Sequence, residues 1–145
     1  MAAVVNIYIE TNITGIKPAD GSVITVLEFV ASNGKKATKT IQNKVAHITG
    51  KQAVLDAVNT ALKMLNRPCY ITLYVSNQYV FETIRNKRLH QWIKNHWKNA
   101  KGNKVAYEQQ WKEYMSLSSK HSVCIACSRH SYYEWMQAQI TREEV

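Results

Sequence analysis

The stretch from Cys69 to Ile84, CYITLYVSNQYVFETI, constrains the fold more than any other part of the sequence. Its first half, from Tyr70 to Val75, is rich in β-branched and aromatic residues, which is typical of a buried strand. At Ser76-Asn77 the pattern changes to two residue types that favour a helix N-cap, and apolar residues then recur at helical spacing. We therefore predict a strand that leads directly into a helix. Ser76 then lies at the carboxyl end of the strand, the edge where ligands gather in open α/β sheets.

The remaining elements are predicted from apolar periodicity. Alternation predicts strands over residues 4–10, 23–30, 36–44 and 121–127, with a loop over 11–22 and an Asn-Gly hairpin turn at 33–34. Helical spacing predicts a helix that Thr49 caps and Arg67-Pro68 ends, and further helices over 107–117 and 132–140. Between them lies a basic helix, broken at 100–103, with one apolar face: Leu89, Trp92, Ile93, His96 and Trp97. The order of elements by itself predicts a mixed α/β domain.

The charge of the chain favours an acidic partner. Nineteen Lys and Arg residues against ten Asp and Glu give a formal charge of +9, and nucleic acid is the first candidate, with a merely soluble basic protein as the alternative. Arg85 to Lys104 holds seven of these cations and no acid. We expect no membrane partner and no signal peptide, because there is no long apolar run and no basic leader. Three cysteines favour a reducing, cytoplasmic location, and we interpret all three as small core residues.

Three segments resemble type I ribonuclease H. Leu73 to Val80 reads LYVSNQYV where that family has Leu-Tyr-Thr-Asp-Ser-x-Tyr-Val. Trp92 to Lys98, WIKNHWK, followed by Trp111, resembles the basic handle with which many bacterial members of the family grip an RNA–DNA hybrid. Cys127 to His130 resembles the end of the last strand and the loop histidine that follows it. The resemblance implies a ribonuclease H-like α/β fold over residues 1–145 as one domain, with a five-stranded mixed sheet and helices on both faces. It also implies a protein of bacterial or mobile-element origin.

The resemblance also implies that the catalytic site is vestigial. The family cuts RNA with two divalent metals held by four carboxylates, and these positions fall at Glu10, Val54, Ser76 and Gln137, or at Ile140 if the last loop is not shortened. With one carboxylate of four retained, we expect no catalytic residues, no metal and no cofactor, and His130 loses its role in proton transfer. The alternative is a weak or altered hydrolase that uses Glu10 with Asp56 or Glu134, and Mg²⁺ or Mn²⁺ as its cofactor.

The binding apparatus of the family is better retained. Thr49 and Lys51 lie where the family binds a phosphate, although a plain helix cap is the alternative, and Gly50 and Lys51 replace the asparagines of the family. We predict a non-catalytic protein that binds a nucleic-acid duplex, either an RNA–DNA hybrid or another duplex. A protein-interaction or inhibitor module with a protein partner is the further alternative. The expected nucleic-acid-binding residues are Thr49, Lys51, Asn77, Lys94, Trp97, Lys98 and Lys101.

Overall fold

The predicted strand-to-helix stretch lies in the middle of the molecule. In the computed structural model, which describes residues 3–144, this strand is β4 (Cys69–Val75). It runs parallel to β1 (Ala3–Thr11) on one side and to β5 (Ser122–Ala126) on the other. Asn77 caps α2 (Gln78–Arg85) directly after β4, and its side chain accepts a hydrogen bond from the backbone N–H of Val80. The junction is therefore confirmed, and it places Ser76 at the carboxyl end of β4.

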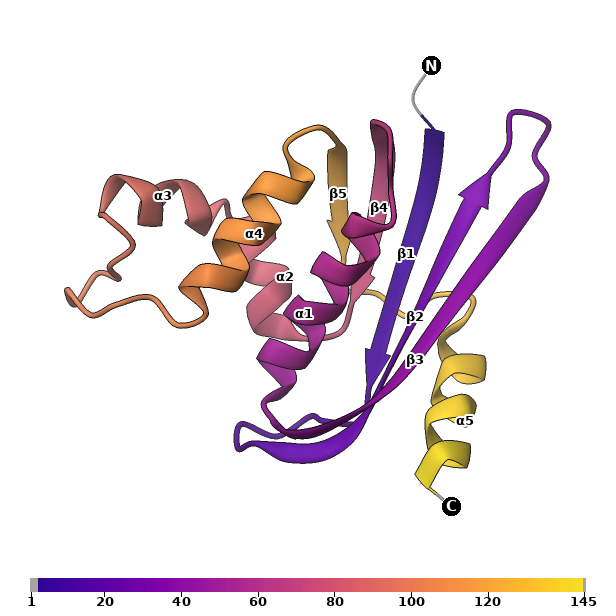
Figure 1. Ribbon diagram of the computed structural model, residues 1–145, viewed down its shortest axis with the longest axis horizontal. Coiled ribbons are helices and arrows are strands. Elements are labelled where there is room, and N and C mark those ends of the chain that lie inside the picture. The colour runs from indigo at the N-terminus through magenta and orange to yellow at the C-terminus, as the bar shows by residue number, and fades with distance from the viewer. Residues whose placement is uncertain (1–2, 145) are drawn as a thin grey trace.

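The first three strands form the predicted antiparallel meander. β1 pairs with β2 (Ala19–Val30), and β2 pairs with β3 (Lys36–Ile48), so the sheet order is β3-β2-β1-β4-β5 (Figure 1). The predicted loop over 11–22 is too long, because β2 begins at Ala19 and β3 continues to Ile48. These extensions pair with each other across a register shift between Ala19 and Gly21. Their residues are largely polar or exposed, and apolar alternation therefore gave no signal for them.

Helices cover both faces of the sheet and divide the core in two. α1 (Gly50–Lys63) and α4 (Glu108–Ser118) lie over one face, and the larger core cluster contains Ile7, Ile9 and Leu73 from that face. α5 (Tyr133–Glu144) lies over β1 and β2 on the other face, as Figure 1 shows. There Met136 and Ile140 pack in a smaller cluster with Tyr8, Ile24 and Val26. Because successive strand residues point to opposite faces, Glu10 lies on the α5 side together with Tyr8.

The handle region, residues 85–104, does not form the long helix that the sequence predicted. α3 spans only Arg88–Lys94, and His96 and Trp97 adopt left-handed backbone conformations with φ of 56° and 63°. The prediction that both residues continue the apolar face of this helix is therefore wrong. The backbone turns back at this point because the N–H of Trp97 bonds to the carbonyl of Trp92, and the two rings pack together. The backbones of Lys98 and Lys104 then pair in an isolated antiparallel β-bridge. The whole segment projects away from the sheet before α4 (Figure 1).

The cysteines correct a second prediction. Cys69 is buried at the start of β4, as expected of a core residue, whereas Cys124 and Cys127 are exposed. The reason is that β5 is an edge strand, and α5 packs on β1 and β2 instead of on β5. Among the described residues, none of the helices is long and apolar enough to span a membrane.

Candidate functional site

Glu10 lies in a closed cluster at the carboxyl end of β1. Its side chain is buried, and the residue is only 4% exposed. Gln137 donates from Nε2 to Glu10 Oε1 over 3.1 Å, and His130 Nε2 lies 3.0 Å from Glu10 Oε2. The structure thus brings together three of the residues expected at the site. Of the two residues expected at the last carboxylate position, Gln137 contacts Glu10, whereas Ile140 packs in the smaller core cluster.

His130 is held in one tautomer by its partners. The backbone N–H of Tyr132 donates to His130 Nδ1 over 3.2 Å, so Nδ1 is unprotonated and we infer that Nε2 carries the hydrogen that bonds to Glu10. The ring also packs against the rings of Tyr8 and Tyr74, at centroid distances of 4.6 and 5.6 Å. Each ring nitrogen of His130 therefore already has a hydrogen-bond partner within the protein.

A buried carboxylate fixes the segment that carries His130. The Tyr132 hydroxyl donates to Glu28 Oε2 over 2.5 Å, and Asn6 and Tyr8 donate to Glu28 Oε1 over 2.9 and 3.4 Å. Burial raises the pKa of Glu28, but the hydrogen bonds from Tyr132 and Asn6 outweigh it, so the pKa lies below its usual value. Sequence reasoning did not identify Glu28 and Tyr132. The available signal was an acidic residue inside an otherwise apolar strand.

The other two residues expected at the carboxylate positions carry no charge. Val54 is 1% exposed and belongs to the larger core cluster, and Ser76 is exposed just beyond β4. The four expected positions are therefore one carboxylate, one amide, one hydroxyl and one valine. Divalent ions such as Mg²⁺ require hard oxygen ligands with compensating negative charge, and these residues do not fit two such ions. Within residues 3–144, no three or more His, Cys, Asp or Glu side chains are grouped so as to hold a metal ion.

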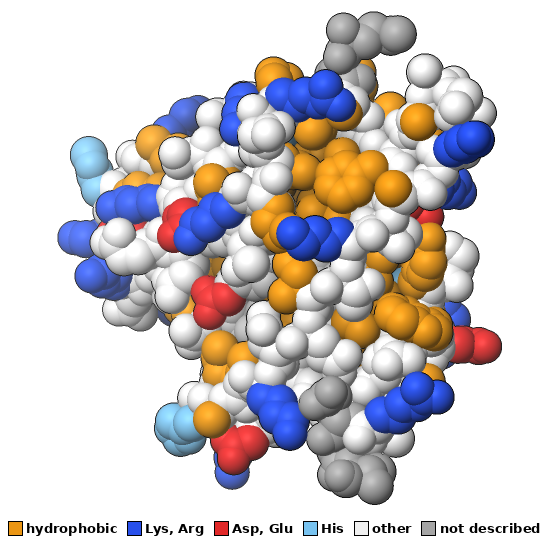
Figure 2. Space-filling model, turned by 45° about the vertical axis from the view of Figure 1, so that its right-hand side comes forward, with side chains coloured by type: hydrophobic (Ala, Val, Ile, Leu, Met, Phe, Trp, Pro, Cys, Tyr) orange, Lys and Arg blue, Asp and Glu red, His pale blue; other side chains and the backbone are white. Residues whose placement is uncertain are grey.

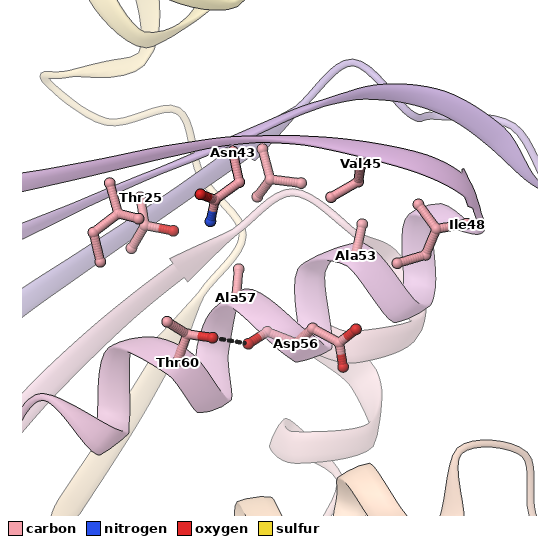
Figure 3. Close-up of a pocket in the computed structure, with 10 residues that line it drawn as sticks. Thr25, Asn43, Val45, Ile48, Ala53, Asp56, Ala57 and Thr60 are labelled. Carbon is pink, nitrogen blue, oxygen red and sulfur yellow. Dashed lines mark hydrogen bonds between the residues drawn. The ribbon is translucent and has the colours of Figure 1, made fainter.

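The two spare acids lie elsewhere. Asp56 lines a pocket between α1 and β3, where Thr60 Oγ1 donates to its backbone carbonyl over 2.9 Å (Figure 3). The pocket is on the α1 side of the sheet, opposite to Glu10, and burial there raises the pKa of Asp56. Glu134 is exposed in the first turn of α5, one turn before the residue that contacts Glu10. The other residues that line the pocket are Val23, Thr25, Ile41, Asn43, Val45, Ile48, Ala53 and Ala57.

A second pocket lies where α1 and α2 begin. Thr49 caps α1 by accepting from the N–H of Gln52, and its hydroxyl also lies 2.7 Å from the Tyr107 hydroxyl at the start of α4. The Lys51 ammonium lies 4.7 Å from the centroid of the Tyr79 ring. The lining contains no acid, so the pocket suits an anionic group. It brings two of the expected binding residues together: the lining residues are Thr11, Ile13, Thr14, Lys51, Ser76, Asn77, Gln78 and Tyr79.

The handle presents exposed cations on an aromatic base. Lys94, Lys98 and Lys101 are exposed, whereas Trp97 is half-buried and packs against the larger core cluster. Its ring lies 6.4 Å from that of Trp92, and the Lys112 ammonium lies 5.4 Å from its centroid. The structure thus gives Trp97 a role in anchoring the handle, which sequence reasoning did not assign to it.

The acids on the neighbouring helices do not neutralise the three handle lysines. Glu108 pairs with Lys112 at 2.8 Å, and this hydrogen bond lowers the pKa of Glu108. Glu113 pairs with Lys63 at 2.8 Å, and Glu82 pairs with Arg88 at 3.4 Å. Figure 2 shows Lys and Arg side chains at the handle side of the molecule, on the left of that view. The positive charge of this region is therefore available to an outside partner.

Comparison with known proteins identifies the family. The sequence matches the family model of RNase H over residues 17–130. The chain belongs to the ribonuclease H family. The matched segment begins after Glu10 and ends before Gln137, so two of the four expected carboxylate positions fall outside it.

Similar proteins carry the name of the family. Ribonuclease H of Lachnoclostridium phytofermentans is 29% identical over 119 residues, which are 82% of this chain and 75% of that protein. Ribonuclease HI of Helicobacter pylori is 35% identical over 106 residues, 73% of this chain and 66% of that protein. Ribonuclease H of Thermoanaerobacter pseudethanolicus is 32% identical over 120 residues, 83% of this chain and 74% of that protein. The chain thus spans about two thirds to three quarters of the length of these relatives.

Solved structures confirm the fold. LC9-RNase H1, a type 1 RNase H with the type 2 active-site motif, superposes with a TM-score of 0.79 at 15% identity, over 98% of this chain and 72% of that chain. The foamy viral protease-reverse transcriptase in complex with RNA/DNA hybrid gives a TM-score of 0.67 at 18% identity, over 97% of this chain and 20% of that chain. The predicted ribonuclease H-like fold, a five-stranded mixed α/β sheet, is therefore confirmed.

Proposed function

We propose that residues 1–145 form one ribonuclease H-like domain that is catalytically inactive and binds a nucleic-acid duplex. The observation that carries the inactivity is the cluster around Glu10. Both oxygens of this carboxylate accept hydrogen bonds from neutral groups of Gln137 and His130, and the position of the second carboxylate is the buried Val54. One carboxylate that is already occupied does not supply the charge that two divalent ions require.

The proposed ligand is an RNA–DNA hybrid or another duplex. The support is the exposed lysines of the handle, together with the acid-free pocket at the start of α1 and α2. Exposed cations release counterions when they meet phosphates, which drives binding without sequence preference. Structural neighbours of this chain include foamy viral reverse transcriptases in complex with dsDNA and with an RNA/DNA hybrid.

A cleavage assay tests the inactivity. A labelled RNA–DNA hybrid is incubated with excess protein and Mg²⁺ or Mn²⁺, beside an active ribonuclease H as positive control. We expect no product from this chain. Cleavage that depends on the metal and disappears in Glu10→Gln would contradict the proposal, because it would show that Glu10 still serves a catalytic site.

Restoring the carboxylates tests the placement of the four positions. We expect that Glu10→Asp, Val54→Glu, Ser76→Asp and Gln137→Asp together create divalent-ion binding that calorimetry detects. The ions would compensate the repulsion among four carboxylates. If the quadruple variant folds but binds no Mn²⁺, then at least one of the four positions is wrongly assigned.

Fluorescence anisotropy tests the ligand. We expect submicromolar binding of the wild type to at least one of hybrid, duplex RNA and duplex DNA at low salt, with affinity that falls steeply as salt rises. If the wild type binds none of the three, then nucleic acid is not its partner, and a protein partner becomes the leading hypothesis.

Ribonuclease H activity itself is the second candidate function. The observation that favours it is the naming of the relatives, which are called ribonuclease H or ribonuclease HI at 29–35% identity. The cleavage assay separates the two candidates, because only the second predicts a metal-dependent product.

A further inference from the structure

An isoleucine projects from the surface beside the proposed binding site. Ile16 lies in the connection between β1 and β2 and is 89% exposed, against 59% or less for the other exposed large hydrophobic residues that the structure describes. A Cβ added at the neighbouring Gly15 would meet nothing within 4 Å, so the tip of this connection stands clear of the protein. A single exposed apolar residue is ordinary on a protein surface. The significance of Ile16 therefore rests on its position, above a fixed base and beside the second pocket.

The base of this connection is fixed. Thr11 Oγ1 donates to the carbonyl of Ser22 over 2.8 Å, and the N–H of Ser22 donates to Asn12 Oδ1 over 2.9 Å. Ile13 is buried in the larger core cluster, and its carbonyl oxygen lies so close to Gly50 that a side chain at that position would collide with it. The base of the connection is thus fixed, and it carries the exposed side chain of Ile16 three residues beyond the buried Ile13.

The rigid base adjoins the second pocket. Ile13 and Thr14 line this pocket together with Lys51 and Asn77, and the tip follows directly in the chain with Lys17 beside Ile16. Figure 1 shows the connection between β1 and β2 next to the start of α1, on the side where the chain enters α4. The bond between the hydroxyls of Thr49 and Tyr107 joins these last two elements. A duplex whose phosphates meet Lys51 would therefore have Ile16 beside it.

We propose that Ile16 is an apolar wedge that enters the minor groove of the bound duplex and partly unstacks one base step. This inference rests on the proposed function. Branched apolar side chains are among the residues that proteins insert between base steps from the minor groove. In an A-like helix this groove is wide and shallow, so a short connection can reach its floor, whereas the deep and narrow major groove is closed to it. Lys17 would then meet a phosphate that borders the groove.

The test uses a hybrid that carries one 2-aminopurine in its DNA strand, placed at each position in turn. Unstacking of this base raises its fluorescence. We expect saturating wild-type protein to raise the signal at one or two adjacent positions. Ile16→Ser should abolish the rise and weaken binding about tenfold, with the same dependence on salt, because no phosphate contact is lost. Ile16→Met, which keeps an apolar side chain, should retain both properties.

Val4→Ser is the matched control, because Val4 is 44% exposed and lies on the α5 side of β1. It should change neither fluorescence nor affinity. If Ile16→Ser binds and unstacks as the wild type does, the wedge is wrong while duplex binding stands. If the wild type binds the duplex without any fluorescence rise, the wedge is also wrong. If the wild type binds no duplex at all, that result contradicts both the wedge and the proposed function.

Discussion

The cluster around Glu10 and the handle make opposite use of polar residues. At Glu10, two neutral donors surround one buried carboxylate, and the aromatic rings of Tyr8 and Tyr74 cover the imidazole that closes the cluster. In the handle, by contrast, lysine side chains are exposed and two consecutive residues keep left-handed backbone conformations. The first region satisfies all its own hydrogen bonds. The second leaves its charge to an outside partner.

This contrast agrees with the proposed function, in which the fold binds a polyanion without cutting it. Four clustered carboxylates repel phosphates unless cations lie between them. Under the proposed placement of the carboxylate positions, Val54, Ser76 and Gln137 add no such repulsion. The charge of the handle is then unopposed, in agreement with the net charge of +9 for the whole chain.

The largest effect is expected when a negative charge is introduced into the buried core at Val54. Val54→Glu should lower the free energy of unfolding by about 3 to 5 kcal/mol, because an unpaired carboxyl would be buried in the core. Urea denaturation measures the loss. Gln109→Glu, on the exposed side of α4, is the control and should stay within about 0.5 kcal/mol of the wild type. A loss below about 1 kcal/mol for Val54→Glu would mean that this position is open to water.

The second prediction removes positive charge from the handle. Replacement of Lys94, Lys98 and Lys101 by Gln should remove about three phosphate contacts, so the slope of log affinity against log salt should fall by roughly 2 to 3. Anisotropy titrations at several salt concentrations measure the slope. The control carries Lys35, Lys36 and Lys39 replaced by Gln, in and beside β3 and away from the handle. If both triple variants lose the same slope, the binding charge is spread over the molecule and the handle is not its centre.

Tyr132→Phe tests how much the hydrogen bond between Tyr132 and Glu28 stabilises the protein. The variant loses a hydrogen bond to the Glu28 carboxylate, and at pH 7 the free energy of unfolding should fall by about 1.5 to 2 kcal/mol. The folded-state pKa of Glu28 lies below its ordinary value of 4.5, so its stabilising contribution is present above that pH and disappears as the pH falls further. The deficit of the variant should therefore shrink at pH 3. Tyr70→Phe, at an exposed tyrosine, should show no such pH dependence.

The smallest expected effect concerns the backbone of the handle. His96→Gly should raise the free energy of unfolding by up to about 1 kcal/mol, because His96 has a φ of 56° and only glycine adopts that conformation without strain. Thermal denaturation measures the gain. The matched control is His90→Gly within α3, which should cost about 1 kcal/mol. A loss in both variants would show that His96 belongs to a regular helix.

Local patterns predicted the elements, and the errors fall where local patterns conflict with packing. The Asn77 cap after β4 and the Thr49 cap of α1 appeared where the sequence placed them, because a cap is decided by residues within one turn. His96 and Trp97 continue the helical spacing of α3, yet the helix ends at Lys94 and Asn95 caps it. The Trp97 ring instead packs on Trp92 and the core, and burial of an indole outweighs the weak preference for another helical turn.

The sequence by itself determined the family and the order of the elements, because each of these can be identified from short stretches of residues. Only the tertiary structure decided that Glu10 meets Gln137 and His130, which are 127 and 120 residues away in the chain. These contacts depend on how α5 is oriented about its own axis. Met136 and Ile140 fix that orientation because they pack against the sheet. No local pattern specifies how a helix rotates against a strand that lies at the other end of the chain, because the packing of both elements fixes it.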